Sequence, residues 1–282
     1  MRDVIIPNPK KLERTKEAMQ HDGAECLHVL ADFDQTLMKA FVDGKMIKSF
    51  TGALRRHSLL TPDYGANATA LSEKYFPIEK DVSIPLDERK QTMQEWWSKL
   101  FDLLIDSGLT RDHILHAIDL SNAQLRDGAV ELFSTLNKYS IPLVIMSATA
   151  LGSHAITMFL KKNNVLFPNI QIIANTFVWD DTGKVIGVNK PFIHALNKDD
   201  TAIQSFPAHG EVKHRKNVIL LGDIVDDLGM VKGFDYANLI TIGFLNEEVE
   251  KRLPEFRENF DVIVLNDGPM DVVNDIIESL VQ

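Results

Sequence analysis

Two carboxylates two residues apart are the feature of this chain best suited to chemistry. Asp32 and Asp34 lie in the DFDQT stretch of residues 32–36, directly after the apolar run of residues 27–31. At such a place one carboxylate can attack a phosphorus centre while the second transfers the proton of the leaving group. Aspartate is also common in plain turns after a strand. The motif alone therefore leaves both interpretations open.

Three later positions carry groups that would assist such an attack. Ser147 follows the apolar run of residues 142–146, and a hydroxyl with backbone N–H groups at a strand-to-helix turn binds anions, although a plain helix cap is the commoner role of an isolated serine. Lys198 offers an ammonium that would offset the negative charge, but its local sequence does not set it apart from Lys190. Asp223 follows a glycine at the end of another apolar run, which is typical of a Mg²⁺ site.

The elements that must position these residues alternate along the chain. Short runs rich in valine, isoleucine and leucine indicate buried strands, and patterns of helical period lie between them. We therefore expect an α/β fold with a doubly wound parallel sheet, whose ligands bind beyond the carboxyl ends of the strands. The expected strands are residues 27–31, 142–146, 218–221, 239–244 and 262–265, and the expected helices are residues 129–138, 153–162, 247–260 and 270–281.

The region between the first two strands breaks this alternation. Helical patterns are expected at residues 67–75, 86–104 and 111–117, and prolines punctuate the segment. A helical insertion at this place would lie above the strand ends as a cap. We predict a catalytic core of residues 1–39 and 128–282, with a helical cap of residues 40–127 that determines substrate specificity.

Composition excludes several classes of function. The 282 residues carry a formal net charge of −10, and no block of lysine and arginine offers a nucleic-acid polymer a binding surface. The single cysteine, Cys26, favours a reducing compartment, and no apolar run is long enough to span a membrane. The N-terminus lacks a signal-peptide core. We expect a cytoplasmic monomer that acts on a small molecule.

The four motifs, in this order, resemble the haloacid dehalogenase superfamily of aspartate-nucleophile phosphotransferases. The resemblance implies that Asp32 is the nucleophile and forms an aspartyl-phosphate, while Asp34 is the general acid and base. It implies that Ser147, Ala148 and Lys198 bind the phosphoryl group. The resemblance also implies a Mg²⁺ cofactor, with the Asp32 carboxylate, the Asp34 backbone carbonyl and Asp223 as its ligands. It implies that Asp227 supports the site by orienting Lys198.

Almost the whole chain is also similar to the cytosolic pyrimidine 5′-nucleotidases (cytosolic 5′-nucleotidase III). The similarity is carried by residues 59–62, 74–81, 93–99, 141–144, 193–198 and 242–246, and it singles out Lys198 over Lys190. It implies that Glu79 binds the base of a nucleoside monophosphate and that Trp97 stacks on that base, with Phe50 as a second stacking partner. Packing within the cap is an equal alternative for Trp97. The neighbouring tryptophans also resemble the branch that hydrolyses 7-methylguanosine monophosphate, because a cationic base gains from an aromatic face.

Three departures from the family pattern concern specificity and the metal turn. Ile224 replaces a hydroxyl residue, Asp226 replaces a glycine, and Leu100 stands where a small polar residue is expected near the base. The prediction is a Mg²⁺-dependent 5′-nucleotidase for pyrimidine nucleotides such as CMP and UMP, or for 7-methylguanosine monophosphate. The alternatives are a phosphatase of the same superfamily with a non-nucleotide substrate and a non-catalytic binding protein.

Overall fold

A seven-stranded sheet forms the centre of the molecule in the computed structural model, which describes residues 4–47, 49–198, 210 and 212–281. Its strand order is β1-β11-β10-β9-β2-β5-β6, and all neighbours are parallel except β1, which runs antiparallel to β11 at one edge. The predicted doubly wound sheet is confirmed. The strands are β1 (Val4–Ile5), β2 (Leu27–Asp32), β5 (Leu143–Met146), β6 (Ile170–Ile173), β9 (Asn217–Gly222), β10 (Asn238–Leu245) and β11 (Val262–Leu265).

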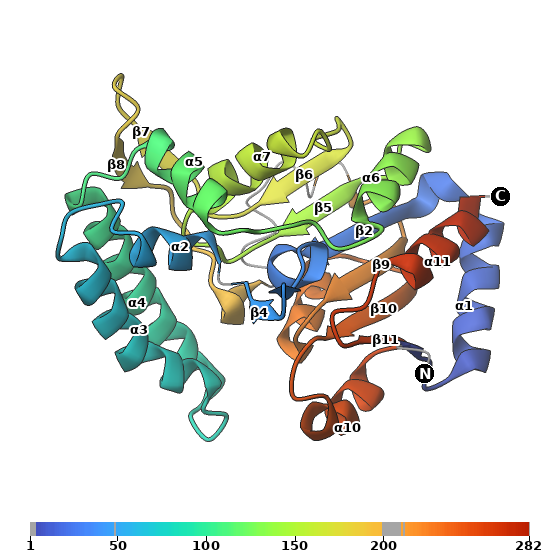
Figure 1. The fold of residues 1–282 in the computed structure, drawn as a ribbon. Coiled ribbons are helices and arrows are strands. Elements are labelled where there is room, and N and C mark those ends of the chain that lie inside the picture. Colours follow the sequence, from blue (N-terminus) through green and yellow to red (C-terminus); the bar gives the residue numbers. More distant parts are fainter. Residues whose placement is uncertain (1–3, 48, 199–209, 211, 282) are drawn as a thin grey trace.

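Helices cover both faces of this sheet (Figure 1). Side chains of β2 alternate between the faces, so Val29 belongs to one buried cluster and Leu30 to the other. The first cluster includes the apolar faces of α1, α6, α7 and α11, and the second includes that of α10. These helices are α1 (Pro9–Asp22), α6 (Ala129–Lys138), α7 (Gly152–Lys162), α10 (Val249–Asn259) and α11 (Asp271–Val281).

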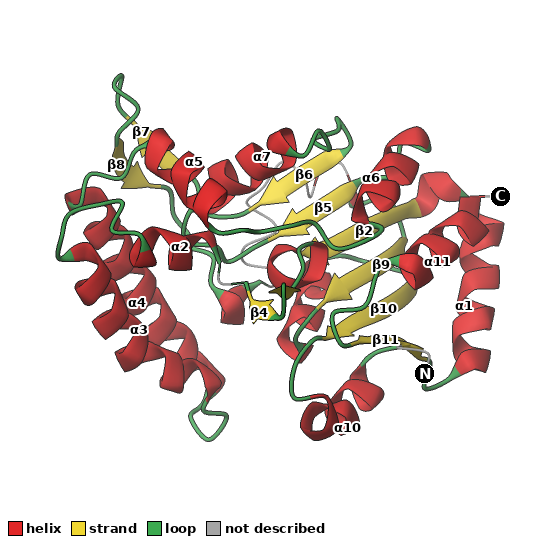
Figure 2. Cartoon of the chain, in the orientation of Figure 1, coloured by secondary structure: helices red, strands yellow, loops and turns green. Residues whose placement is uncertain are grey.

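The inserted helices lie beyond the carboxyl ends of the strands, as Figures 1 and 2 show. In α3 the helix continues through Pro77 to Lys80, five residues further than its sequence pattern predicts. Two short hairpins accompany them, and the second, β7–β8, packs against α4 and so extends this side of the molecule. The elements are β3 (Phe41–Val42), β4 (Lys45–Met46), α2 (Phe50–Arg56), α3 (Tyr64–Lys80), α4 (Leu86–Asp106), α5 (Arg111–Leu120), β7 (Phe177–Trp179) and β8 (Val185–Val188).

Short helical turns connect the strands to the rest of the chain. Two of them, Phe33–Leu37 after β2 and Val225–Gly233 after β9, follow strand ends that carry polar residues at the carboxyl edge of the sheet. The turns are Ala24–Cys26, Phe33–Leu37, Ala195–Asn197 and Val225–Gly233. Among the described residues, no helix has both the length and the apolar character needed to cross a bilayer.

Candidate active site

Strand β2 delivers Asp32 to the carboxyl edge of the sheet, between β9 and β5. The chain then turns sharply through Gln35, whose φ of 60° lies in the left-handed region. The Gln35 carbonyl accepts hydrogen bonds from the guanidinium of Arg126 and, at 2.9 Å, from Asn246 Nδ2. These bonds stabilise the turn that places Asp34 beside the same edge, so both predicted carboxylates face one site.

Lys198 occupies the floor of this site. Its buried ammonium donates hydrogen bonds to Asp32 Oδ1 and, over 3.0 Å, to Asp227 Oδ1. Burial alone would lower the pKa of Lys198, but the carboxylates of Asp227 and Asp32 outweigh this effect and raise it. The lysine is therefore a fixed cation at the point where a phosphate would meet Asp32.

The turn after β9 is built around Asp227. Its Oδ2 accepts hydrogen bonds from the backbone N–H of Asp223 at 3.1 Å and of Ile224 at 3.3 Å. A Cβ added to Gly222 would lie 2.6 Å from Cβ of Asp227, so the turn requires glycine there. These donors belong to the backbone. The replacement of a hydroxyl side chain by Ile224 therefore leaves the hydrogen bonds of the Asp227 carboxylate in place.

The acidic residues at this edge fit a divalent cation. Asp32, Asp223 and Asp227 each offer one carboxylate oxygen, and these atoms lie within 4.8 Å of one another. Only oxygen donors are present in this group, which is the ligand type that Mg²⁺ prefers. The predicted ligands Asp32 and Asp223 are thus brought together, and Asp227 joins them in addition to holding Lys198.

Burial shifts the acidities of these groups upward. It raises the pKa of Asp32 to about 7, although Lys198 counteracts the rise, and it raises the pKa of Asp34 to about 6. Burial, together with the neighbouring carboxylates of Asp227 and Asp32, also raises the pKa of Asp223 well above its usual value. A bound cation would favour the ionised forms of the ligands.

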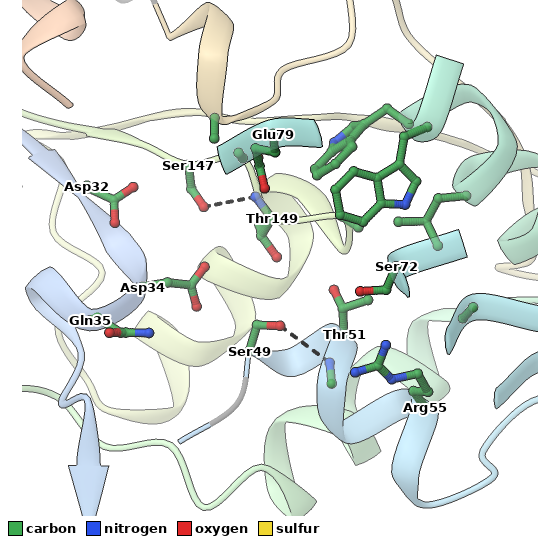
Figure 3. Close-up of a pocket in the computed structure, with 18 of the residues that line it drawn as sticks. Asp32, Asp34, Gln35, Ser49, Thr51, Arg55, Ser72, Glu79, Ser147 and Thr149 are labelled. Carbon is green, nitrogen blue, oxygen red and sulfur yellow. Dashed lines mark hydrogen bonds between the residues drawn. The ribbon is translucent and has the colours of Figure 1, made fainter. Parts of the chain in front are cut away.

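Ser147 stands at the end of β5, buried beside the same edge. Its Oγ accepts a hydrogen bond of 3.1 Å from the backbone N–H of Thr149, as Figure 3 shows, and its own O–H stays available to donate. Ala148 lines the site next to it. The chain enters α7 through Gly152, whose φ is +67°. The arrangement offers hydroxyl and backbone donors to an anion at Asp32.

A cavity of about 470 Å³ extends from these residues to the inserted helices. Glu79, Trp96, Trp97 and Leu100 line it, and burial raises the pKa of Glu79. The indole N–H of Trp97 has no hydrogen-bond partner among the described residues. One face of Trp96 stacks on Tyr75, with ring centroids 5.9 Å apart and an interplanar angle of 12°. Glu79 and Trp97, the two residues predicted to bind the base, therefore both line the cavity.

Phe50 differs from its expected position. Its side chain is 1% exposed, and its ring packs against those of Phe33 and Phe159, at centroid distances of 6.1 and 5.5 Å. It is not among the residues that line the cavity. In this conformation the ring faces the apolar core, so its contribution is packing under the cavity and not a surface for a base.

Several residues of the cavity carry no signal in the sequence. Arg55 and Thr51 come from α2, for which no helix is predicted, and Ser72 comes from α3. Figure 3 shows these three side chains together, across the cavity from Asp32. A basic residue in a short amphipathic helix is normally exposed, so only the packing of α2 reveals that Arg55 lines a site.

Comparison with known proteins identifies the family of this chain. A family model described as pyrimidine 5′-nucleotidase (UMPH-1) covers residues 35–281. The 7-methylguanosine phosphate-specific 5′-nucleotidases of Gallus gallus and Homo sapiens are each 31% identical to the chain. The matches span 97% of this chain and 94% of the Gallus gallus protein, and 98% of this chain and 92% of the Homo sapiens protein.

Solved structures give the same result. The crystal structure of cytosolic 5′-nucleotidase IIIB bound to cytidine superposes with a TM-score of 0.90 at 27% identity, covering 99% of this chain and 94% of that one. A substrate-bound phosphoserine phosphatase, at 16% identity and a TM-score of 0.51, covers 88% of this chain and 96% of its own. That second similarity extends to the fold alone.

Proposed function

Because this chain belongs to the pyrimidine 5′-nucleotidase family, we propose that it hydrolyses nucleoside 5′-monophosphates to a nucleoside and phosphate, with Mg²⁺ as cofactor. The observation that carries the proposal is the ammonium of Lys198, which is held between Asp32 and Asp227 and lines the cavity. A phosphate placed there would meet a nucleophile and a fixed cation together. The remainder of the cavity would receive the nucleoside.

In the proposed first step, a carboxylate oxygen of Asp32 attacks phosphorus. The bond from phosphorus to the 5′-oxygen breaks as the new bond forms, and Asp34 gives its proton to the leaving oxygen. The pKa of Asp34, raised by burial to about 6, favours the protonated form more than an ordinary aspartate would. Lys198, the Ser147 hydroxyl and the Ala148 N–H would bind the phosphoryl oxygens.

In the second step, Asp34 acts as the base. It takes a proton from a water molecule, whose oxygen attacks the phosphorus of the aspartyl-phosphate, and phosphate leaves as Asp32 is restored. Mg²⁺, held by Asp32, Asp223 and the Asp34 carbonyl, would supply positive charge that offsets the charge of the transferring group. Asp227 would orient Lys198 and lies close enough to contribute to the ion.

The inserted helices would select the base. Glu79 would accept a hydrogen bond from an exocyclic amino group, and Trp97 would stack on the ring. We propose residues 40–127 as the cap and residues 1–39 and 128–282 as the core. The protein would act as a cytoplasmic monomer on small nucleotides, without a nucleic-acid polymer or a membrane as partner.

Phosphate release from a panel of nucleoside monophosphates, measured with and without Mg²⁺, tests the proposal. We expect turnover of at least one nucleotide, a decrease of about a hundredfold when a chelator removes the metal, and recovery when Mg²⁺ is restored. A sugar phosphate added to the panel is the control for the base. Turnover of the sugar phosphate alone would contradict the proposal that the substrate is a nucleotide. The absence of any turnover would contradict the proposal that the protein is an enzyme.

A change at Glu79 tests base recognition. In Glu79→Gln the loss of the charged acceptor is expected to lower kcat/KM for CMP about tenfold and that for UMP much less, because uracil has no amino group to donate. The matched control is Glu73→Gln, an exposed position on the same helix. Equal decreases for both nucleotides would show that Glu79 does not contact the base.

A further inference from the structure

The helix α2 presents a cation to the cavity. Ser49 caps its N-terminus by accepting a hydrogen bond of 3.4 Å from the Gly52 N–H. The buried face of the helix, which includes Phe50 and Leu54, packs into the core. Thr51 and Arg55, one helical turn apart, therefore lie together on another face, and both line the cavity. The neighbouring Arg56 is exposed to solvent.

The position of Arg55 is fixed by the packing of α2 against α3. A Cβ added to Gly65 would lie 3.0 Å from the carbonyl oxygen of Arg55, so the two helices approach as closely as glycine permits. The positive charge of Arg55 acts on the neighbouring helix α3. Burial raises the pKa of Tyr64, and Arg55 opposes that rise. The backbone of Arg55 is thus held by the fold, and its side chain lines the cavity from this fixed position.

Within the described part of the chain, the guanidinium of Arg55 forms no ion pair and no hydrogen bond that would occupy its donors. The hydroxyl-bearing residues Thr51 and Ser72 lie beside it, and Asp32 lies across the cavity (Figure 3). A guanidinium carries five donors in a rigid fork that matches two adjacent acceptors. An unpaired fork in a cavity wall is a binding element for a ligand.

We propose that Arg55 is a specificity-determining residue that binds the acceptor edge of an uncharged base, best supplied by O6 and N7 of guanine, and disfavours 7-methylguanine. This inference rests on the proposed function, which puts the phosphate at Asp32 and the nucleoside at Arg55. The fork of an arginine pairs with O6 and N7 of guanine. Methylation of N7 removes one acceptor and places a positive charge against the guanidinium.

The aromatic wall acts in the opposite direction. Trp96 and Trp97, whose ring centroids are 4.9 Å apart, would favour a cationic base through cation–π attraction. Selection between guanine and 7-methylguanine is then a balance between this attraction and the repulsion from Arg55. In the wild-type chain the charge of Arg55 directs the balance toward the uncharged base. Removal of that charge leaves the preference of the tryptophans.

The test compares GMP with 7-methylguanosine monophosphate, which differ by one methyl group and its charge. In Arg55→Met the ratio of kcat/KM for GMP to that for the methylated nucleotide is expected to fall about tenfold or more, through a loss for GMP and a gain for the methylated substrate. Arg55→Lys keeps the charge without the fork, so it should weaken GMP and still disfavour the methylated base. Arg56→Met is the matched control and should leave the ratio unchanged.

Two outcomes would overturn the role of Arg55. In the first, the ratio of kcat/KM for GMP to that for the methylated nucleotide stays within twofold of wild type in Arg55→Met. Equal decreases for both nucleotides would give this result. In the second, the wild-type chain turns over pyrimidine nucleotides and neither purine nucleotide. The binding of both nucleotides, monitored by tryptophan fluorescence, distinguishes a failure of this inference from a failure of the proposed reaction. A chain that binds GMP in preference to its methylated form through Arg55, and hydrolyses no monophosphate, would contradict the reaction alone.

Discussion

Replacement of Asp32 by asparagine is expected to lower kcat by about four orders of magnitude or more, the size of effect seen when a covalent nucleophile is removed. The amide oxygen of asparagine can still accept the hydrogen bond from Lys198, so the site should keep its shape. The amide is a poor nucleophile toward phosphorus, and it removes one charged ligand from the predicted metal site. Both effects reduce the rate in the same direction.

The measurement is phosphate release under saturating nucleotide, together with acid quenching of the reaction to detect phosphate bound covalently to the chain. Wild-type protein should carry an acid-stable acyl-phosphate, and Asp32→Asn should carry none. Asp226→Asn, an exposed change in the turn after β9, is the control and should alter kcat less than about threefold. Substantial turnover by Asp32→Asn would exclude the covalent mechanism and leave direct attack by water.

The residues at the strand ends could be predicted because parallel strands bring their carboxyl ends to one edge. The order β9-β2-β5 makes the three strands neighbours, so Asp223, Asp32 and Ser147 meet although they are far apart in the sequence. Lys198 needed the family resemblance, since local sequence does not separate it from Lys190. In the structure Lys190 is exposed near the ring of Phe192, whereas Lys198 is buried against two carboxylates.

The wall of the cavity could not be predicted in the same way. A helix of seven residues such as α2 has too few turns for a clear apolar period. Successive side chains on a helix point about 100° apart, so Phe50 and Thr51 face different surroundings. The resemblance placed Phe50 near the base, and the helix instead turns this ring to the core and Arg55 to the cavity. The short strands β1, β7 and β8 likewise have no readable period.

Arg126 was also not predicted from the sequence. It connects the two segments through which the chain passes between the sheet and the inserted helices. Its side chain, 0% exposed, forms an ion pair of 2.9 Å with Asp267. It also donates hydrogen bonds to backbone carbonyls, and its backbone N–H donates to Leu37 O at 2.9 Å. The carbonyl acceptors of its side chain are those of Gln35, Thr36, Met38 and Gly268. One arginine thus holds the turn that follows Asp34.

Arg126→Met is expected to lower the free energy of unfolding by about 3–5 kcal/mol, since it removes one partner of a buried ion pair and leaves several carbonyls without a donor. For a chain of this length that corresponds to a decrease in Tm of roughly 5–8 °C. Urea unfolding and thermal melting measure the loss. Arg14→Met, an exposed change on α1, is the matched control and should stay within about 0.5 kcal/mol of wild type.

A double-mutant cycle with Asp267→Asn separates the ion pair from the carbonyl contacts. Asp267 also accepts hydrogen bonds from the backbone N–H groups of Ala40 and Phe41, so it ties the start of the first hairpin to the same cluster. If the ion pair dominates, the double mutant should lose clearly less stability than the sum of the single losses. Additive losses would instead assign the effect to the carbonyls around Gln35. In that case the folded fraction of Arg126→Met should also show a lower kcat, because the turn that places Asp34 would no longer be held.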